Sequence, residues 1–117
     1  MPSETPERRR RLLVSQLVES RRSNEPVVFE ASGRSIEYDD RVIRLELDAD
    51  ERNRLETLRS TYHVFKIKQP ETMKADGGVV YLSAVTDAKH AADFVDSLFR
   101  EVYGLGDEFE LRTSEAT

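Results

Sequence analysis

The chain has 117 residues, no cysteine and a formal net charge of −5. This length suits one domain with a hydrophobic core and leaves no room for a second. The lack of cysteine excludes disulfides, thiolate catalysis and cysteine-based zinc or iron–sulfur sites. The apolar runs are too short for a spanning helix, and the residues after Arg8–Arg11 are too polar for a signal peptide. We therefore expect a cytoplasmic protein.

The charges are unevenly distributed along the chain. There are 14 Arg and only 4 Lys, and the first 22 residues hold six Arg and three Glu, so the remaining 95 residues carry −8. This acidic, lysine-poor composition resembles that of small uncharacterised proteins of salt-loving archaea, and the resemblance implies solubility where salt screens charge strongly. A GC-rich genome, which favours Arg codons over Lys codons, is the alternative explanation.

The N-terminal part predicts one helix after a flexible tail at residues 1–5. Pro6 suits a first helical turn, and the helical pattern continues to about Arg22. Its apolar stripe is only two turns long, so we expect this helix to dock against the core rather than form its centre. The stripe consists of Leu13, Val14, Leu17 and Val18.

A β-meander is predicted next. Strands are expected at 27–31, 35–38 and 41–47, joined by tight turns at Ser32-Gly33 and Asp39-Asp40. The third strand alternates apolar and charged residues, which is typical of a strand with one buried and one solvated face. Its inward residues are Ile43, Leu45 and Leu47.

The middle of the chain predicts a helix, a strand and a loop. Asp48 or Asp50 is expected to cap a helix that has few apolar anchors. Residues 63–69 alternate as a strand would, with Phe65 and Ile67 on one side. Residues 70–78 are expected to form a long loop.

The clearest pattern is a buried strand at 79–85 followed by an amphipathic helix at 88–103. Thr86 and Asp87 are expected to cap this helix and Gly104 to end it. A last strand at 107–112 would turn Phe109 and Leu111 inward, and residues 113–117 are expected to be a flexible tail.

These elements predict a single α+β domain over residues 1–117. It should have two layers: a mainly antiparallel sheet of five or six strands, with helices on one face, in the order α-β-β-β-α-β-β-α(-β). The order within 41–112 resembles the ferredoxin-like fold, and the whole chain without its last strand resembles secretion-chaperone-like domains. The predicted core comprises Leu13, Leu17, Val27, Phe29, Ile43, Leu45, Leu47, Phe65, Ile67, Val79, Leu82, Val95, Leu98, Phe99 and Val102.

No residue pattern indicates catalysis, a cofactor or a metal site. His63 and His90 have no spacing that links them, and no helical HExxH motif is present. The acids at 48–51 lack the glycine and final glutamate of a calcium loop. Gly77-Gly78 precedes a strand instead of opening a helix, so it does not form a phosphate loop. We therefore expect a protein that is not an enzyme, with function otherwise unknown.

Two surfaces are candidates for contact with a partner. The mixed-charge face of the sheet is expected to pair with a second copy of the chain or with another protein, which makes a homodimeric interaction module the leading hypothesis. The alternative is a nucleic-acid-associated accessory protein that uses the arginine-rich helix, although the acidic remainder of the chain opposes this. The sheet surface comprises Arg44, Glu46, Lys66, Lys68 and Tyr81, and the nucleic-acid candidates are Arg8, Arg9, Arg10 and Arg11.

Overall fold

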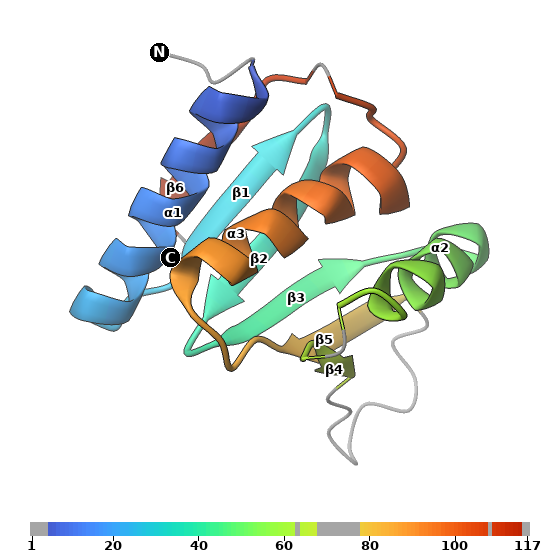
Figure 1. Cartoon of the computed structure of the whole chain (residues 1–117), viewed down its shortest axis with the longest axis horizontal. Coiled ribbons are helices and arrows are strands. Elements are labelled where there is room, and N and C mark those ends of the chain that lie inside the picture. Colours follow the sequence, from blue (N-terminus) through green and yellow to red (C-terminus); the bar gives the residue numbers. More distant parts are fainter. Residues whose placement is uncertain (1–4, 63, 68–77, 108, 116–117) are drawn as a thin grey trace.

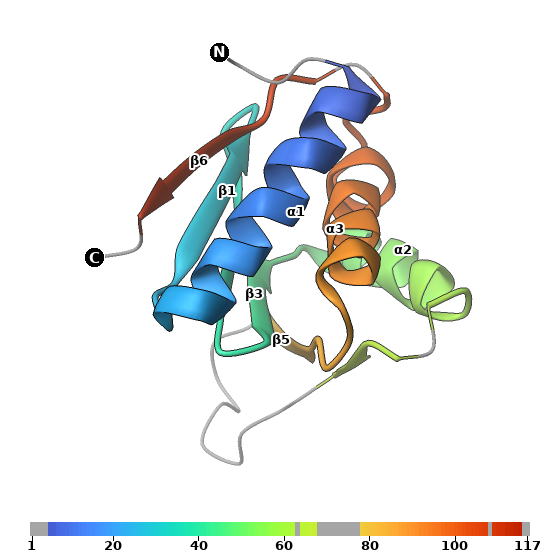
Figure 2. The same ribbon diagram turned by 60° about the vertical axis from the view of Figure 1, so that its left-hand side comes forward.

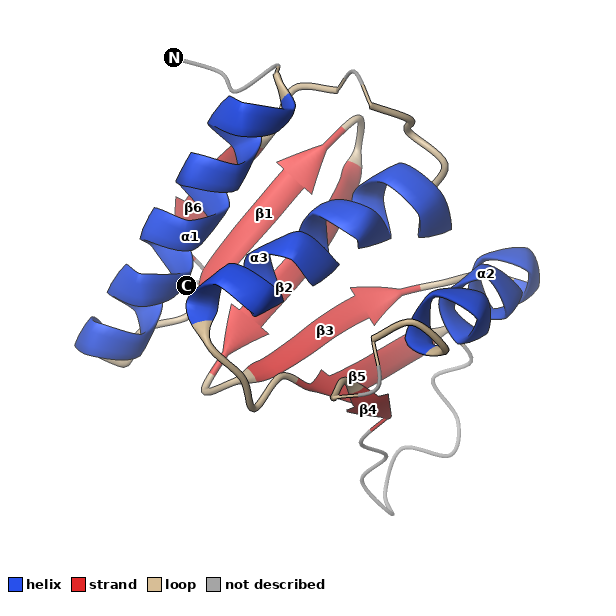
Figure 3. Ribbon diagram, viewed as in Figure 1, coloured by secondary structure: helices blue, strands red, loops and turns tan. Residues whose placement is uncertain are grey.

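A computed structural model describes residues 5–62, 64–67, 78–107 and 109–115, and it confirms the two-layer α+β fold (Figure 1). The six strands within these described residues form one antiparallel sheet in the order β4-β5-β3-β2-β1-β6. The helices lie on one side of it (Figure 3). The elements are α1 (Pro6–Ser23), β1 (Val27–Ala31), β2 (Arg34–Asp39), β3 (Val42–Glu46), α2 (Ala49–Arg59), β4 (Lys66–Ile67), β5 (Val79–Ser83), α3 (Ala88–Ser97), the π-helical turn η1 (Leu98–Val102) and β6 (Arg112–Glu115).

Helix α1 begins and ends with capping residues. The Thr5 side chain accepts a hydrogen bond from the Arg8 amide at 3.2 Å, and Asn24 ends the helix in the left-handed conformation at φ 58°. Leu13 and Leu17 are fully buried, and the helix packs beside α3 over the side of the sheet that β1 and β2 form (Figure 1). The prediction that this helix docks on the core is confirmed.

The β-meander matches the prediction closely. The first turn has positive φ at Ser32 and Gly33, as a two-residue hairpin turn requires. The second turn lies one residue later than predicted, at Asp40 and Arg41, which both have positive φ. Asp39 belongs to β2 because it pairs with Val42 across the hairpin.

Helix α2 begins at a complete capping box. Asp48 is the capping residue, and its partner in the box is Glu51. Of the two capping residues that the sequence allowed, Asp48 and Asp50, the structure therefore identifies Asp48.

The segment after α2 is only partly described. In the described part of the predicted strand at 63–69, β4 spans two residues and Phe65 is fully buried. His63, the side chain of Ile67 and residues 68–77, which include most of the predicted loop, lie outside the described residues.

Strand β5 corrects one predicted core residue. Val80 and Leu82 are buried, whereas Val79 is half-buried and belongs to the opposite face. Side chains of a strand alternate between faces, so Val79 and Leu82 could not both point inward. The strand also ends at Ser83, two residues before the predicted end at Val85.

The long C-terminal helix is present and ends in a π-helical turn that the sequence did not predict. The Asp87 side chain accepts from the His90 amide at 2.7 Å and caps α3. The Tyr103 amide then donates to the Leu98 carbonyl at 2.9 Å, the wider spacing of a π-turn. Gly104 ends the helix at φ 73°, as predicted.

The end of the chain differs most from the prediction. The strand expected at 107–112 lies at Arg112–Glu115 instead and pairs antiparallel with β1 (Figure 2). Residues 113–115, expected to belong to a flexible tail, therefore belong to the sheet. An unpaired strand edge offers hydrogen-bonding groups to almost any sequence, which explains why side-chain pattern did not reveal this pairing. Phe109 and Leu111 are buried as predicted.

The strand order also separates the two resemblances. Since β6 pairs with β1 and not with β3, the segment 41–112 does not form a sheet of its own, as a ferredoxin-like unit would. The secretion-chaperone-like element order, with β6 added at the β1 edge, agrees with the structure. Among the described residues, no helix is long and apolar enough to cross a membrane.

Candidate interaction surface

One face of the sheet has no helix packed on it within the described residues. Helices α1, α2 and α3 all lie on the other face, which carries the apolar core (Figure 2). The strands alternate buried and exposed positions, so every second residue points to the uncovered face. Its side chains are Val28, Glu30, Ser35, Glu37, Asp39, Val42, Arg44, Glu46, Lys66, Val79, Tyr81, Ser83, Arg112 and Ser114.

Four of these residues form one row across the middle of the sheet. Val28 of β1 pairs with Glu37 of β2, Glu37 pairs with Arg44 of β3, and Arg44 pairs with Tyr81 of β5. All four side chains are half-buried. We call these four residues the central row. It has an apolar residue at each end and opposite charges in the middle.

The charges of the central row are poorly satisfied within the chain. Glu37 forms no ion pair with any described residue, although Arg44 lies directly opposite it on the next strand. Arg44 lies 3.7 Å from Glu46, and these two side chains are 40% and 72% exposed. An exposed pair at that distance contributes little to stability. The row therefore has charged groups available to a partner.

The predicted sheet surface agrees with this face as far as it is described. Arg44, Glu46, Lys66 and Tyr81 all lie on it, and Lys68 falls outside the described residues.

Sequence reasoning missed Val28 and Glu37, the two residues that complete the central row. The signal was present, because both lie at outward positions of strands that were predicted correctly. The missing information was the order of those strands in the sheet.

A shallow depression runs along the uncovered face from the central row to the end of the sheet, where Arg34, Glu51 and Tyr103 line it. The Arg34 guanidinium donates to Glu51 at 2.8 Å and lies 4.2 Å above the centre of the Tyr103 ring. The Tyr103 hydroxyl donates to the Glu46 carbonyl at 3.0 Å. Burial raises the pKa of Tyr103 to about 12, although the neighbouring guanidinium acts in the opposite direction. These contacts join β2, β3, α2 and the end of the last helix.

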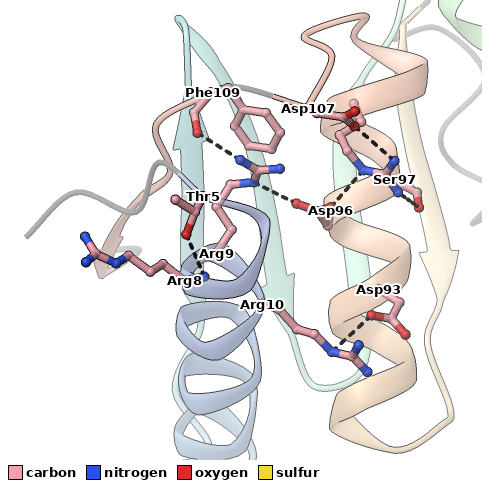
Figure 4. A network of polar contacts seen from close by, with 10 residues as sticks. Thr5, Arg8, Arg9, Arg10, Asp93, Asp96, Ser97, Asp107 and Phe109 are labelled. Atoms are coloured by element: carbon pink, nitrogen blue, oxygen red, sulfur yellow. Dashed lines mark hydrogen bonds and ion pairs between the residues drawn. The ribbon is translucent and has the colours of Figure 1, made fainter.

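Arg9 does not belong to an exposed basic surface. Its side chain is fully buried between α1 and α3 (Figure 4). The Nε donates to Asp96 Oδ1 at 3.0 Å, an Nη donates to the Phe109 carbonyl at 3.3 Å, and the guanidinium lies 3.9 Å above the Phe109 ring. The prediction of Arg9 as a nucleic-acid contact is corrected, because this residue ties the N-terminal helix to the core.

The other arginines of the candidate nucleic-acid set remain accessible. Arg8 and Arg11 are exposed, and the Arg8 amide is part of the helix cap. Arg10 lies 3.4 Å from Asp93 of α3, and both side chains are largely exposed (Figure 4). Three arginines thus remain on the surface, one of them beside an acid.

The described histidine and the acidic residues form no metal-binding cluster among the described residues. His90 is exposed, and its ring contacts those of Tyr62 and Phe65, with ring centres 5.6 and 5.5 Å apart. His63 lies outside the described residues. In the part of the chain that the structure describes, no three His, Asp or Glu residues are grouped so that they could hold a metal ion.

Comparison with known proteins gives a family but no activity. Residues 2–116 match a family of unknown function, DUF7975, and the chain belongs to that family. No curated protein and no solved structure matches the chain significantly. The function of the chain is therefore unknown, and the geometry described above is the basis for proposing one.

Proposed function

We propose that this protein is a non-enzymatic, cytoplasmic interaction module that acts as a homodimer through the uncovered face of its sheet. The observation that carries the proposal is the central row, where half-buried apolar side chains flank charges that have little use within the chain. Two-layer domains with one bare sheet face can bury it by stacking on another sheet.

A second copy of the chain suits this face better than a strongly charged partner does. The face carries Glu30, Glu37 and Glu46 but also Arg44 and Lys66, so a uniformly acidic or basic partner would meet repulsion somewhere. An identical face carries both signs. In a symmetric dimer each patch contacts the same patch of its partner, so one pair of complementary residues is used twice.

Sedimentation velocity over a range of protein concentrations tests the proposal. We expect the wild-type chain of 13.5 kDa to sediment as a dimer. Val28→Arg places a further charge at one end of the central row and should weaken dimerisation by at least about tenfold. Val18→Arg is the matched control, since Val18 is 49% exposed on the outer side of α1.

The control variant should dimerise as the wild type does. A wild-type chain that remains monomeric at high concentration would overturn the proposal. Dimerisation of Val28→Arg as strong as that of Val18→Arg, with circular dichroism unchanged, would show that the sheet face is not the interface.

The alternative function is nucleic-acid binding through α1. Its support is the exposure of Arg8 and Arg11, which form no ion pair with any other described residue. Binding of this kind should weaken steeply as salt increases, because phosphate contacts release counterions. If Arg8→Ser/Arg11→Ser left the affinity for single-stranded RNA or duplex DNA unchanged, this alternative would fail.

We also propose that the protein works at high salt. The support is its composition, with a net charge of −8 on residues 23–117 and few lysines. Concentrated salt would screen the repulsion within each chain and between the two acidic chains of a dimer.

A further inference from the structure

We infer that the two-fold axis of this homodimer runs parallel to the strands, between β2 and β3. The inference rests on the proposed function and specifies its geometry. It follows from the register of the central row, in which β1 and β2 lie on one side of that line and β3 and β5 lie on the other.

Such an axis places complementary side chains opposite one another. Rotation about it exchanges the positions of β2 and β3, so Glu37 faces the partner's Arg44, and Arg44 faces the partner's Glu37. The same rotation exchanges β1 and β5, so Val28 faces the partner's Tyr81. One row thus provides two ion pairs flanked by two apolar contacts, and the flanking contacts exclude water from the charges.

The two neighbouring rows are compatible with this axis. One step along β2 and β3 on one side, Ser35 lies opposite the partner's Glu46, where a hydroxyl can donate to a carboxylate. One step on the other side, Asp39 lies opposite the partner's Val42. Across the four central strands, neither row brings like charges together.

The other simple two-fold arrangement is unfavourable. An axis at right angles to the strands, through the central row, would place Glu37 over the partner's Glu37 and Arg44 over the partner's Arg44. Like charges directly opposite one another destabilise an interface. The axis along the strands also stacks the two sheets with their strands nearly aligned, which is the usual geometry for packed sheets.

Charge reversal tests the register. The Glu37→Arg variant should place an arginine opposite the partner's Arg44 at both symmetric positions of the interface. The Arg44→Glu variant should place two carboxylates opposite one another at the same two positions. Each variant should dimerise at least about tenfold more weakly than the wild type. An equimolar mixture of the two variants should recover dimers that contain one chain of each kind, because each reversed charge then faces its opposite. Native mass spectrometry separates these heterodimers by mass.

The mixture also distinguishes contact between chains from contact within one. In the Glu37→Arg variant, repulsion between the introduced guanidinium and Arg44 of the same chain would persist after mixing, so only pairing across the interface predicts recovery. Glu101→Arg and Arg11→Glu are matched controls, because both residues are exposed on the helical side of the molecule. These controls should leave dimerisation unchanged, and circular dichroism should show that every variant is folded.

The outcomes separate this inference from the proposed function. Dimeric single variants, or single variants that do not recover on mixing, would overturn the axis while the wild-type dimer stands. A monomeric wild type would overturn the proposed function and the axis with it.

Discussion

Arg9 and Arg8 are neighbours in the sequence with opposite environments. Arg9 is fully buried and bonded to Asp96, whereas the Arg8 side chain is exposed. Removing one partner of a buried ion pair leaves the other charge without compensation. We therefore expect Arg9→Ala to lower the free energy of unfolding by about 3 kcal/mol in urea denaturation. Arg8→Ala should change it by no more than about 0.5 kcal/mol, and equal effects of the two variants would contradict this assignment.

The burial of Arg9 was predictable from its position in the helix, although arginine side chains are usually exposed. It lies four and eight residues before Leu13 and Leu17, so it shares their stripe on the helix. Because Arg9 is one of four consecutive arginines, its helical spacing from Leu13 and Leu17 was overlooked, and all four were interpreted as one exposed basic patch. The acceptors that make its burial tolerable, Asp96 and the Phe109 carbonyl, come from the far end of the chain, and local pattern does not reveal them.

Tyr103 makes stability sensitive to alkaline pH. Its pKa is about 12 in the folded chain, against an ordinary value of 10.0. The folded state retains the phenolic proton to higher pH than the unfolded state, so its contribution is complete below pH 10 and is lost as the pH rises toward 12. Urea denaturation between these pH values should show a shallower loss of stability in Tyr103→Phe than in the wild type. If the free energy of unfolding fell equally with pH in both proteins, the result would contradict this prediction.

At the scale of elements, the capping box of α2 provides a direct test. The Asp48 carboxylate accepts from the Glu51 amide at 2.8 Å, and the Glu51 carboxylate accepts from the Asp48 amide at 2.9 Å. Asp48→Ala should lower the free energy of unfolding by about 1 kcal/mol. Asp50→Ala is the matched control, because Asp50 is exposed in the first helical turn and does not cap it. A larger effect at Asp50 would contradict the structure.

Local signals explain which elements could be predicted. The hairpin turn at Ser32-Gly33 and the helix end at Gly104 each depend on a few adjacent residues, and each was predicted at the correct position. The helix cap was predicted at Thr86 and Asp87, and Asp87 is the capping residue. Strand β6 depends on a free edge of β1 about 85 residues earlier in the sequence, so its position was missed. For the same reason the sequence predicted the mixed-charge face but not the central row, whose register requires the strand order.

For the whole molecule, we expect stability to depend on salt. The whole chain has a net charge of −5, and residues 23–117 alone carry −8. Salt ions screen the repulsion among these negative charges and so should stabilise the folded state. The Tm measured by differential scanning calorimetry should rise by about 5 °C or more as potassium chloride increases from about 0.1 to 2 M. A flat or falling Tm would favour the explanation that arginine codons reflect genome composition.

The proposed interface is tested by the distance between the two chains of the dimer, measured once from the uncovered face of the sheet and once from the helical side. The chain has no cysteine, so a spin label can be attached at one introduced site. Ser114→Cys lies at the rim of the uncovered face, and Arg11→Cys lies on the helical side. With strands about 4.8 Å apart and stacked layers about 10 Å apart, labels at Ser114 should lie about 25 Å from their copies.

Labels at position 11 should be separated by about 40 Å, because a sheet and a helix layer from each chain lie between them. Pulsed electron–electron double resonance measures both distances in the same buffer. If the uncovered sheet faces pair, the distance between labels at position 114 is shorter than the distance between labels at position 11. The reverse order would place the helices at the interface and contradict the assignment of the uncovered sheet face.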